Sequence, residues 1–171
     1  MRVSVIGGSS IDDETAEVAR EVGRLLGERG HTLVCGGLGG VMEATCRGAR
    51  EHEQGEGSNR ASGDRGAASR ERDAETIGIL PTTRRADAND WVTTPIATGL
   101  GNARNPIVVL NGDAVIAIDG AAGTLSELGH ALDHHRPVAG LDTHGVDLEG
   151  FRAVETPRAA VDYVESAVDH R

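Results

Sequence analysis

Lysine is absent from this chain of 171 residues, and all 17 of its Lys or Arg residues are arginines. A pyridoxal-phosphate enzyme needs a lysine for its Schiff base, and a Walker-type P-loop needs a lysine to contact the nucleotide phosphates. The absence of lysine therefore excludes both classes of protein on chemical grounds.

Aromatic residues and cysteines are also scarce. One Phe, one Tyr and one Trp leave Val, Ile, Leu and Ala to build the core. The two cysteines, Cys35 and Cys46, lack a Cys-x-x-Cys spacing and have small or apolar neighbours. We therefore interpret both as core residues in a reducing compartment, rather than as metal ligands or catalytic thiols.

Positive charge and long apolar runs are in short supply. Asp and Glu total 27 and the formal net charge is −10, so a nucleic-acid backbone would be repelled and we expect no such partner. No apolar run approaches about 18 residues and no leader pattern precedes the first strand, so we expect a soluble, cytoplasmic protein with no membrane partner. The acid excess resembles that of halophilic proteins, although codon bias with an ordinary acidic pI gives the same composition.

The chain does contain a regular alternation of strand and helix patterns. Strands are expected at 2–6, 32–35, 76–81, 92–98, 113–119 and 137–142. Helices are expected from Asp12 or Asp13 to Gly30, over about 41–50 and 101–110, from the 119–128 stretch to about His134, and after Thr156. This alternation predicts one nucleotide-binding domain over 1–171 of the α/β class, a Rossmann-like three-layer sandwich with a mostly parallel sheet.

Residues 52–75 interrupt the alternation, since they contain no Val, Ile, Leu, Met, Phe, Trp, Tyr or Cys. Nothing in this segment can offset the entropy of ordering it, so we expect a disordered insertion. It joins a helix to the next strand, at the amino ends of the strands, whereas ligands bind at their carboxyl ends. We therefore interpret it as a surface loop rather than a lid.

Three stretches of small residues each follow an expected strand and precede an expected helix. Their candidate ligand-binding residues are Gly7, Gly8 and Ser9, then Gly37, Gly39 and Gly40, then Gly120, Ala121, Gly123 and Thr124. Glycine lets the backbone approach a ligand closely, and the free N–H groups at a helix start attract an anion. The sequence therefore predicts a phosphate site where the three stretches converge, unless the small residues serve only close packing of strands and helices.

Two ionisable residues are expected at the same edge of the sheet. Glu127 falls in the first turn of the helix that follows the third stretch, and Arg104 begins a helix after a strand. A carboxylate there can bind sugar hydroxyls or stabilise positive charge that develops on a sugar, and an arginine can hold a phosphate. The alternatives are a carboxylate that interacts with the helix dipole and a surface ion pair.

These stretches resemble the motifs of the family named after the plant LOG (lonely guy) enzymes, long misannotated as lysine decarboxylases. DGAAGTLSE, at 119–127, resembles the signature PGGxGTxxE, and CGGLGGVMEA, at 35–44, resembles GGGxxGLMG. GLGNARN, at 99–105, occupies the place of the family's Arg-Lys motif. The resemblance spans most of the chain.

The resemblance implies a homodimer or larger homo-oligomer and a phosphoribohydrolase activity. Such an enzyme cleaves the N-glycosidic bond of a nucleoside 5′-monophosphate to give the base and ribose 5-phosphate, with no metal or organic cofactor required. By position, Arg104 and Glu127 match the catalytic Arg and Glu. Gly120, Gly123 and Thr124 match the phosphate-binding loop.

Three departures from the family pattern keep a second interpretation open. Asp119 stands in place of a proline, Ala121 in place of the second glycine, and Asn105 in place of the lysine. In these features the chain is closer to a branch related to molybdenum cofactor carrier proteins, which bind a phosphorylated pterin without necessarily cleaving it. The alternatives are therefore a carrier or sensor of a nucleotide or of molybdenum cofactor, or a degenerate site.

Other candidates are weaker. His130 and His134 have i, i+4 spacing but no accompanying Glu-x-x-His pattern, so we expect no metal site. Trp91 either stacks on a base or anchors a loop, and Met42 is expected in the core. Gly7-Gly8-Ser9 lacks the full GxGxxG spacing, which disfavours an NAD-dependent oxidoreductase.

Overall fold

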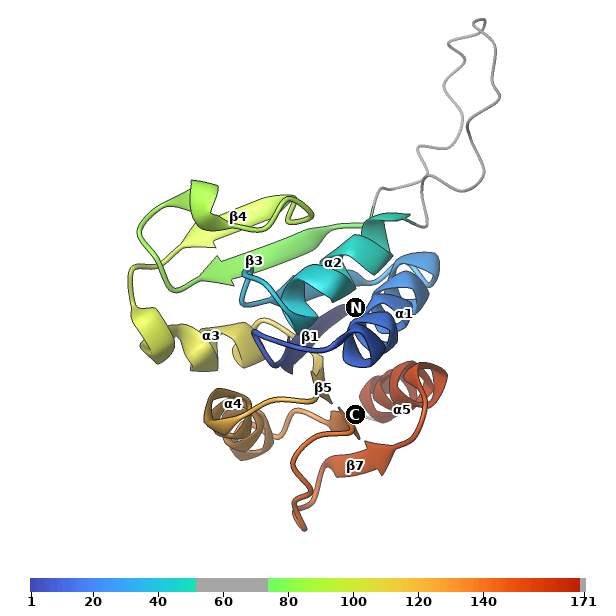
Figure 1. Cartoon of the computed structure of the whole chain (residues 1–171). Coiled ribbons are helices and arrows are strands. Elements are labelled where there is room, and N and C mark those ends of the chain that lie inside the picture. The colour runs from blue at the N-terminus through green and yellow to red at the C-terminus, as the bar shows by residue number, and fades with distance from the viewer. Residues whose placement is uncertain (52–73, 170–171) are drawn as a thin grey trace, which may run out of the picture.

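The computed structural model describes residues 1–51 and 74–169 (Figure 1). The strands are β1 (Arg2–Gly7), β2 (Thr32–Cys35), β3 (Thr76–Leu80), β4 (Thr94–Ala97), β5 (Ala114–Ile118), β6 (Val138–Leu141) and β7 (Phe151–Val154). The helices are α1 (Asp13–Glu28), α2 (Val41–Glu51), α3 (Asn105–Leu110), α4 (Ala122–Asp133) and α5 (Pro157–Asp169), with short 3-10 helices η2 (Arg85–Asp87) and η3 (Gly101–Arg104). The expected disorder at 52–75 concerns a segment of which 52–73 lie outside the described residues.

The described strands form one sheet in the order β4-β3-β2-β1-β5-β6-β7, and every neighbouring pair is parallel. The expected α/β sandwich with a parallel sheet is therefore confirmed. β1 is central and pairs with β2 on one side and with β5 on the other. The chain thus builds outward from β1 in one direction and then in the other, and ligands bind at such a switch point in open parallel sheets.

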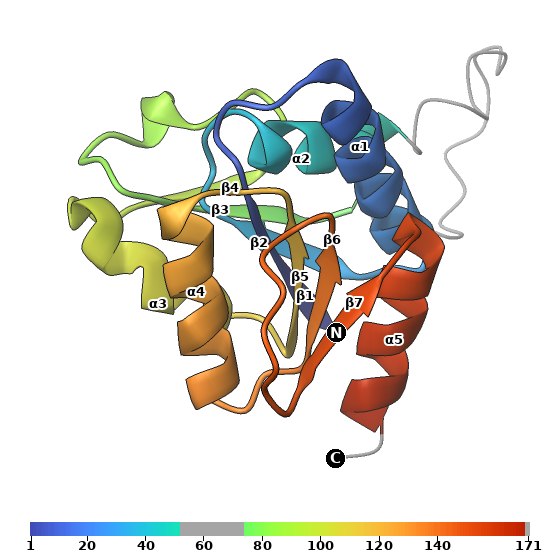
Figure 2. The same ribbon diagram turned by 60° about the horizontal axis from the view of Figure 1, so that its bottom comes forward.

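Helices cover both faces of the sheet, with α1, α2 and α5 on one face and α3 and α4 on the other (Figure 2). The alternation along β1 shows why both faces need a cover. Val3 and Val5 pack in the core that includes α1, α2 and α5, whereas Ile6 packs in the core that includes α3 and α4. Ser4 is also buried, and its hydroxyl donates to the Val108 carbonyl in α3 at 2.8 Å.

α1 and α2 cross in backbone contact because glycines lie at the crossing. A Cβ added to Gly48 would lie 1.9 Å from the carbonyl oxygen of Arg20, and a Cβ added to Gly23 would lie 1.9 Å from that of Thr45. No side chain fits in such a gap. The crossing therefore requires glycine on both helices.

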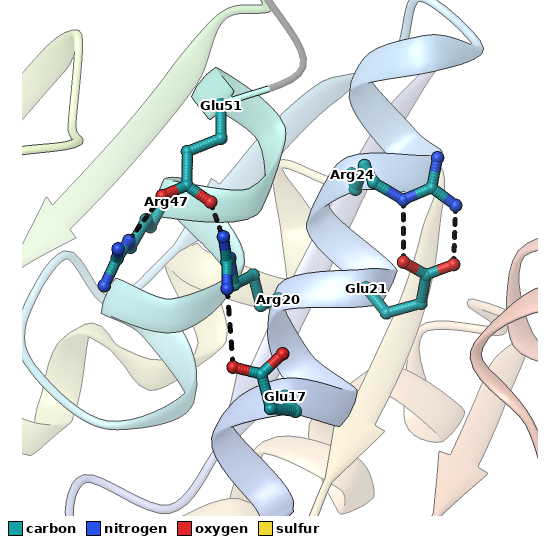
Figure 3. A network of polar contacts seen from close by, with 6 residues as sticks. All are labelled: Glu17, Arg20, Glu21, Arg24, Arg47 and Glu51. Carbon is teal, nitrogen blue, oxygen red and sulfur yellow. Dashed lines mark hydrogen bonds and ion pairs between the residues drawn. The ribbon is translucent and has the colours of Figure 1, made fainter. Parts of the chain in front are cut away.

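Ion pairs lie on the outer surface of the same two helices (Figure 3). Arg20 of α1 reaches Glu51 of α2, with Nε 2.5 Å from Oε2, and Arg47 reaches the other oxygen of Glu51 at 2.7 Å. Within α1, Arg24 pairs with Glu21 at 2.6 Å. These side chains are partly exposed, so the pairs lie at the surface outside the core, and the Arg20–Glu51 pair links the two helices.

Two details differ from or extend the sequence expectations. β7 was not expected, and it is a short edge strand that pairs with β6 alone. Trp91 is not a lining residue of the cavity described below: it packs, partly buried, against the core beneath α1 and α2, and the guanidinium of Arg47 lies 5.7 Å from its ring centroid, as expected for a loop anchor.

Candidate functional site

A cavity of about 260 Å³ opens at the carboxyl ends of the strands, next to the switch point between β1 and β5. This volume is close to the lower end of roughly 300–1,000 Å³ that is typical of small-molecule sites. The lining residues are Val5, Ile6, Gly7, Gly8, Ser9, Gly36, Leu38, Met42, Pro81, Asn102, Arg104, Asn105, Ala121, Gly123, Thr124 and Glu127. All three small-residue stretches therefore meet at one cavity.

Eight of the predicted ligand-binding and catalytic residues line this cavity: Gly7, Gly8, Ser9, Arg104, Ala121, Gly123, Thr124 and Glu127. Gly37, Gly39, Gly40 and Gly120 are not among the lining residues. A Cβ at Gly40 would lie 2.3 Å from the Gly8 carbonyl oxygen, and one at Gly37 would lie 2.7 Å from a Leu80 methyl group. Gly37 and Gly40 therefore hold the loops against their neighbours instead of facing the cavity.

The third stretch leads into α4 without a capping side chain. The N-cap residue is Ala121, which has no side-chain oxygen to accept from the N–H groups of the first turn, and Gly123 and Thr124 of this turn line the cavity. Asp, Asn, Ser or Thr is the usual choice at this position. Unsatisfied N–H groups and the helix dipole make the start of α4 a place for an anion.

Asp119, the acidic residue that precedes this helix, places its carboxylate beside the first glycine-rich stretch. Its carboxylate lies against Gly8, where an added Cβ would be 2.5 Å from Oδ2. Its backbone has a positive φ of 50°, and its carbonyl accepts from Thr143 Oγ1 at 2.6 Å. Asp119 is not a lining residue itself, but Gly8, beside which its carboxylate lies, is one.

Arg104 and Glu127 meet across the cavity from two different elements. Arg104 Nη1 lies 3.5 Å from Glu127 Oε1, and the two side chains are 9% and 10% exposed. α4 begins at Ala122, so Glu127 lies in the second turn rather than the first. Both residues are buried at the edge of the cavity, which rules out the surface ion pair and a solvated carboxylate at the helix start.

Arg104 is held by protein acceptors as well as by Glu127. Its Nε donates to the Ile79 carbonyl at 2.9 Å, and its Nη1 donates to Asn105 Oδ1. Asn105, which stands where the LOG-like motif has a lysine, therefore orients Arg104. Two of the three guanidinium nitrogens point to protein oxygens, so the position of the third is fixed.

Burial dominates the electrostatics of this pair. Burial raises the pKa of Glu127 to about 7, against the opposing effect of the positive charge on Arg104. Burial also lowers the pKa of Arg104, against the opposing effect of Glu127. Near neutral pH the Glu127 carboxyl can therefore either donate or accept a proton, which suits a general acid or base.

Sequence reasoning missed several lining residues. Asn102 and Asn105 present amide groups, and Met42, expected in the core, is both buried there and part of the cavity wall. Gly36 lines the cavity in place of its neighbour Gly37. The motif that contains both asparagines was the available signal, but their contacts depend on the tertiary structure.

The described part of the chain, 1–51 and 74–169, holds no group of three or more His, Cys, Asp or Glu side chains arranged for a metal ion. His130 of α4 is partly buried, and His134, the residue that follows α4, is exposed. Over the same residues, no helix combines the length and apolar character needed to span a bilayer.

Sequence and structure comparisons agree with this architecture. The model of the SLOG cluster4 family matches residues 1–56 and 61–169. An uncharacterised protein of Archaeoglobus fulgidus is 39% identical over 168 residues, which cover 98% of this chain and 96% of the relative.

Two solved structures are similar over nearly the whole chain. The molybdenum cofactor binding protein of Rippkaea orientalis has a TM-score of 0.80 and 29% identity, with 98% of this chain and 96% of that chain covered. The molybdenum cofactor carrier protein of Chlamydomonas reinhardtii has a TM-score of 0.77 and 25% identity, with 98% of each chain covered.

Proposed function

The chain belongs to the SLOG cluster4 family, and from that premise we propose that it binds and carries a small phosphorylated ligand, with molybdenum cofactor as the first candidate. Membership agrees with the resemblance to LOG-like proteins. The similar structures named for molybdenum cofactor favour a carrier. This order reverses the one that the sequence motifs favoured, in which hydrolysis came first.

The observation that carries the proposal is the start of α4. Ala121 leaves the first-turn N–H groups without a side-chain cap, and this turn forms part of the cavity wall. Gly8 and Ser9 bring a second backbone segment to the same wall. Together these segments offer N–H donors and a helix dipole to a phosphate without needing a lysine.

The lining residues fit a phosphorylated pterin. The backbone at 121–124 would hold the terminal phosphate, and the amides of Asn102 and Asn105 offer donors and acceptors to a heterocycle. Glu127 and Arg104 add one acceptor and one donor group. The cofactor would supply a molybdenum centre for delivery elsewhere, and the chain would bind and shield it.

The test is a charge placed at the start of α4. Neither Gly123 nor Gly129 has a neighbour within 4 Å of an added Cβ, so Gly123→Asp and Gly129→Asp put the same side chain into open space on one helix. Each variant, expressed in a host that makes molybdenum cofactor, is assayed for molybdenum by mass spectrometry and for pterin by fluorescence. We expect at least tenfold less of both in Gly123→Asp and wild-type amounts in Gly129→Asp. Equal amounts of bound cofactor in the two variants, or no bound cofactor in the wild type, would reject the proposal that the protein is a carrier.

A phosphoribohydrolase is the second candidate, and one specific observation favours it. The Glu127 carboxyl has a pKa of about 7 and lies 3.5 Å from Arg104. A group that titrates near neutral pH can move a proton during cleavage of an N-glycosidic bond, and its carboxylate can stabilise an oxocarbenium-like sugar. Arg104 would position the nucleotide.

This candidate is tested with a panel of nucleoside 5′-monophosphates and chromatography for the free base. Glu127→Gln keeps the size of the side chain and removes the titrating carboxyl, while Glu149→Gln makes the same change at an exposed position. Hydrolysis predicts base release by the wild type and by Glu149→Gln, and a loss of about 100-fold or more in Glu127→Gln. If the wild type releases no base from any nucleotide of the panel, the phosphoribohydrolase activity is rejected.

A further inference from the structure

The two cysteines of the chain lie in contact beneath the cavity. Cys35 ends β2 and Cys46 lies on α2, and their Sγ atoms are 3.6 Å apart. Both thiols are free and both residues are fully buried. We propose that Cys35 and Cys46 form a reversible disulfide on reaction with a peroxide, and that this bond changes the wall of the ligand cavity at Gly36.

The surroundings of the two sulfurs differ, and this difference assigns their roles. The backbone N–H of Gly37 donates to Cys35 Sγ at 3.3 Å. The hydrogen bond between the thiols lowers the pKa of Cys35, with burial opposing it, and raises the pKa of Cys46. The thiolate is the reactive form of cysteine, and the N–H of Gly37 stabilises it at Cys35, so we assign Cys35 as the attacking sulfur and Cys46 as the resolving one.

The reaction balances with hydrogen peroxide as the oxidant. The Cys35 thiolate attacks one peroxide oxygen, which breaks the O–O bond, gives a sulfenic acid and releases hydroxide. The Cys46 sulfur then attacks the Cys35 sulfur, the S–O bond breaks and a second hydroxide leaves. The two thiol protons convert the two hydroxides to water, so the dithiol loses two electrons and peroxide gains them. Hydrogen peroxide is small enough to reach the buried sulfurs when the structure opens locally. A larger oxidant, such as a small-molecule disulfide, is not.

Bond formation disturbs the backbone contacts of Cys35 at the cavity. A disulfide brings the sulfurs from 3.6 Å to about 2.05 Å, so Cys35 Sγ has to move from the position in which it accepts from the backbone N–H of Gly37. Cys35 precedes Gly36, which lines the cavity, and a Cβ added to Gly36 would lie 2.5 Å from Arg104 Nη2. A shift of Cys35 is therefore transmitted to the surface on which Arg104 rests.

The first test is a thiol count, which is unambiguous because the chain has only two cysteines. The purified protein is treated with hydrogen peroxide, freed of oxidant, denatured, alkylated with iodoacetamide and weighed intact. We expect a monomer that is lighter by two hydrogen atoms, carries no alkyl group and regains both thiols with dithiothreitol. Two alkylated cysteines, or a disulfide between two chains, would overturn the proposal.

Single-cysteine variants assign the roles. Cys46→Ser should accumulate oxidised Cys35 without a disulfide, whereas Cys35→Ser should keep its remaining thiol under the same treatment. Equal oxidation of the two variants would refute the assigned order. If either variant fails to fold, the wild type is trapped early in the reaction with a sulfenic-acid reagent and mapped by peptide mass spectrometry, and a label on Cys46 instead of Cys35 would refute the order.

The second test reads the cavity wall without any ligand, so it does not depend on the proposed function. Amide hydrogen exchange is compared between the oxidised and reduced protein for Gly36–Gly40 and for β5 as a control. We expect at least a threefold change in the exchange rate of Gly36–Gly40 and none in β5. A disulfide that forms without this change would overturn the link to the cavity.

Discussion

The layer of α1, α2 and α5 and the layer of α3 and α4 cover opposite faces of the same sheet, and they differ in helix packing and in where their charged side chains lie. In the first layer, glycines bring α1 and α2 into backbone contact and charged side chains pair at the surface. In the second layer α3 has only six residues, Leu110 and Leu125 are 41% and 45% exposed, and the charged pair of Arg104 and Glu127 is buried.

The difference separates what stabilises the fold from what the fold positions. Surface ion pairs stabilise a protein by about 0–1 kcal/mol, and the close crossing of α1 and α2 removes apolar area from water. A buried charge pair loses hydration and is weak evidence for stability, but a perturbed pKa in a cleft points to function. The tightly packed layer therefore supports the fold, and the second layer holds the ionisable groups of the site.

A glycine-to-alanine substitution made once in each layer gives the largest expected contrast in stability. Gly48→Ala places a Cβ 1.9 Å from the carbonyl oxygen of Arg20, so α1 and α2 must separate. We expect its free energy of unfolding to fall by about 3 kcal/mol. Gly129→Ala meets nothing within 4 Å and should raise it by up to about 1 kcal/mol through better helix propensity. Urea denaturation of both variants checks this, and equal effects would show that the two layers tolerate side chains alike.

The pH dependence of stability is the next largest effect, and it belongs to the second layer. The pKa of Glu127 is about 7 in the folded chain against an ordinary value of 4.5, so between these values the folded chain binds more protons than the unfolded chain. The Glu127 contribution to stability is therefore complete below pH 4.5 and is lost as the pH rises through 7, by up to about 3 kcal/mol.

Glu127→Gln removes this contribution. As the pH rises, the unfolding free energy of the wild type should therefore fall relative to that of the variant. Denaturant titrations at pH 5 and pH 8 measure that difference, and carboxylates elsewhere cancel from it. A difference that stays constant between the two pH values would mean that Glu127 titrates normally.

The smallest effect concerns the surface of the first layer. Arg20→Ala removes the bridges to Glu51 and Glu17. Because Arg20 is partly exposed, we expect a loss of at most about 1 kcal/mol that shrinks as salt is added. Thermal unfolding at low and high salt measures it. A loss comparable to that of Gly48→Ala would show that the surface charges, and not the helix crossing, hold this layer.

Much of the fold followed from local patterns in the sequence. Each expected strand and helix has a counterpart, because buried parallel strands read as short apolar runs and helices show a repeating apolar face. β7 escaped prediction because it has four residues, pairs on one side and exposes Arg152. The limits of the 92–98 strand were too wide for a similar reason, since β4 is also an edge strand with exposed residues.

The candidate site followed from the sequence in its residue types but not in its contacts. The motifs singled out Arg104 and Glu127, and the structure brings them together. Asn105 looked like the loss of a positive charge, yet it accepts a hydrogen bond from Arg104. Gly36 and Gly37 are adjacent and chemically identical, and only the tertiary arrangement determines which one faces the cavity.

The position of β1 at the centre of the sheet has a consequence for the order of folding. Val3 pairs with Leu33 on one side but with Ala114 on the other, so the second pairing joins residues far apart in the chain. Closing a long loop costs entropy before the contact is gained, which slows the folding of such topologies. During synthesis β1 leaves the ribosome long before β5 and must therefore wait for β5 before both of its edges are paired.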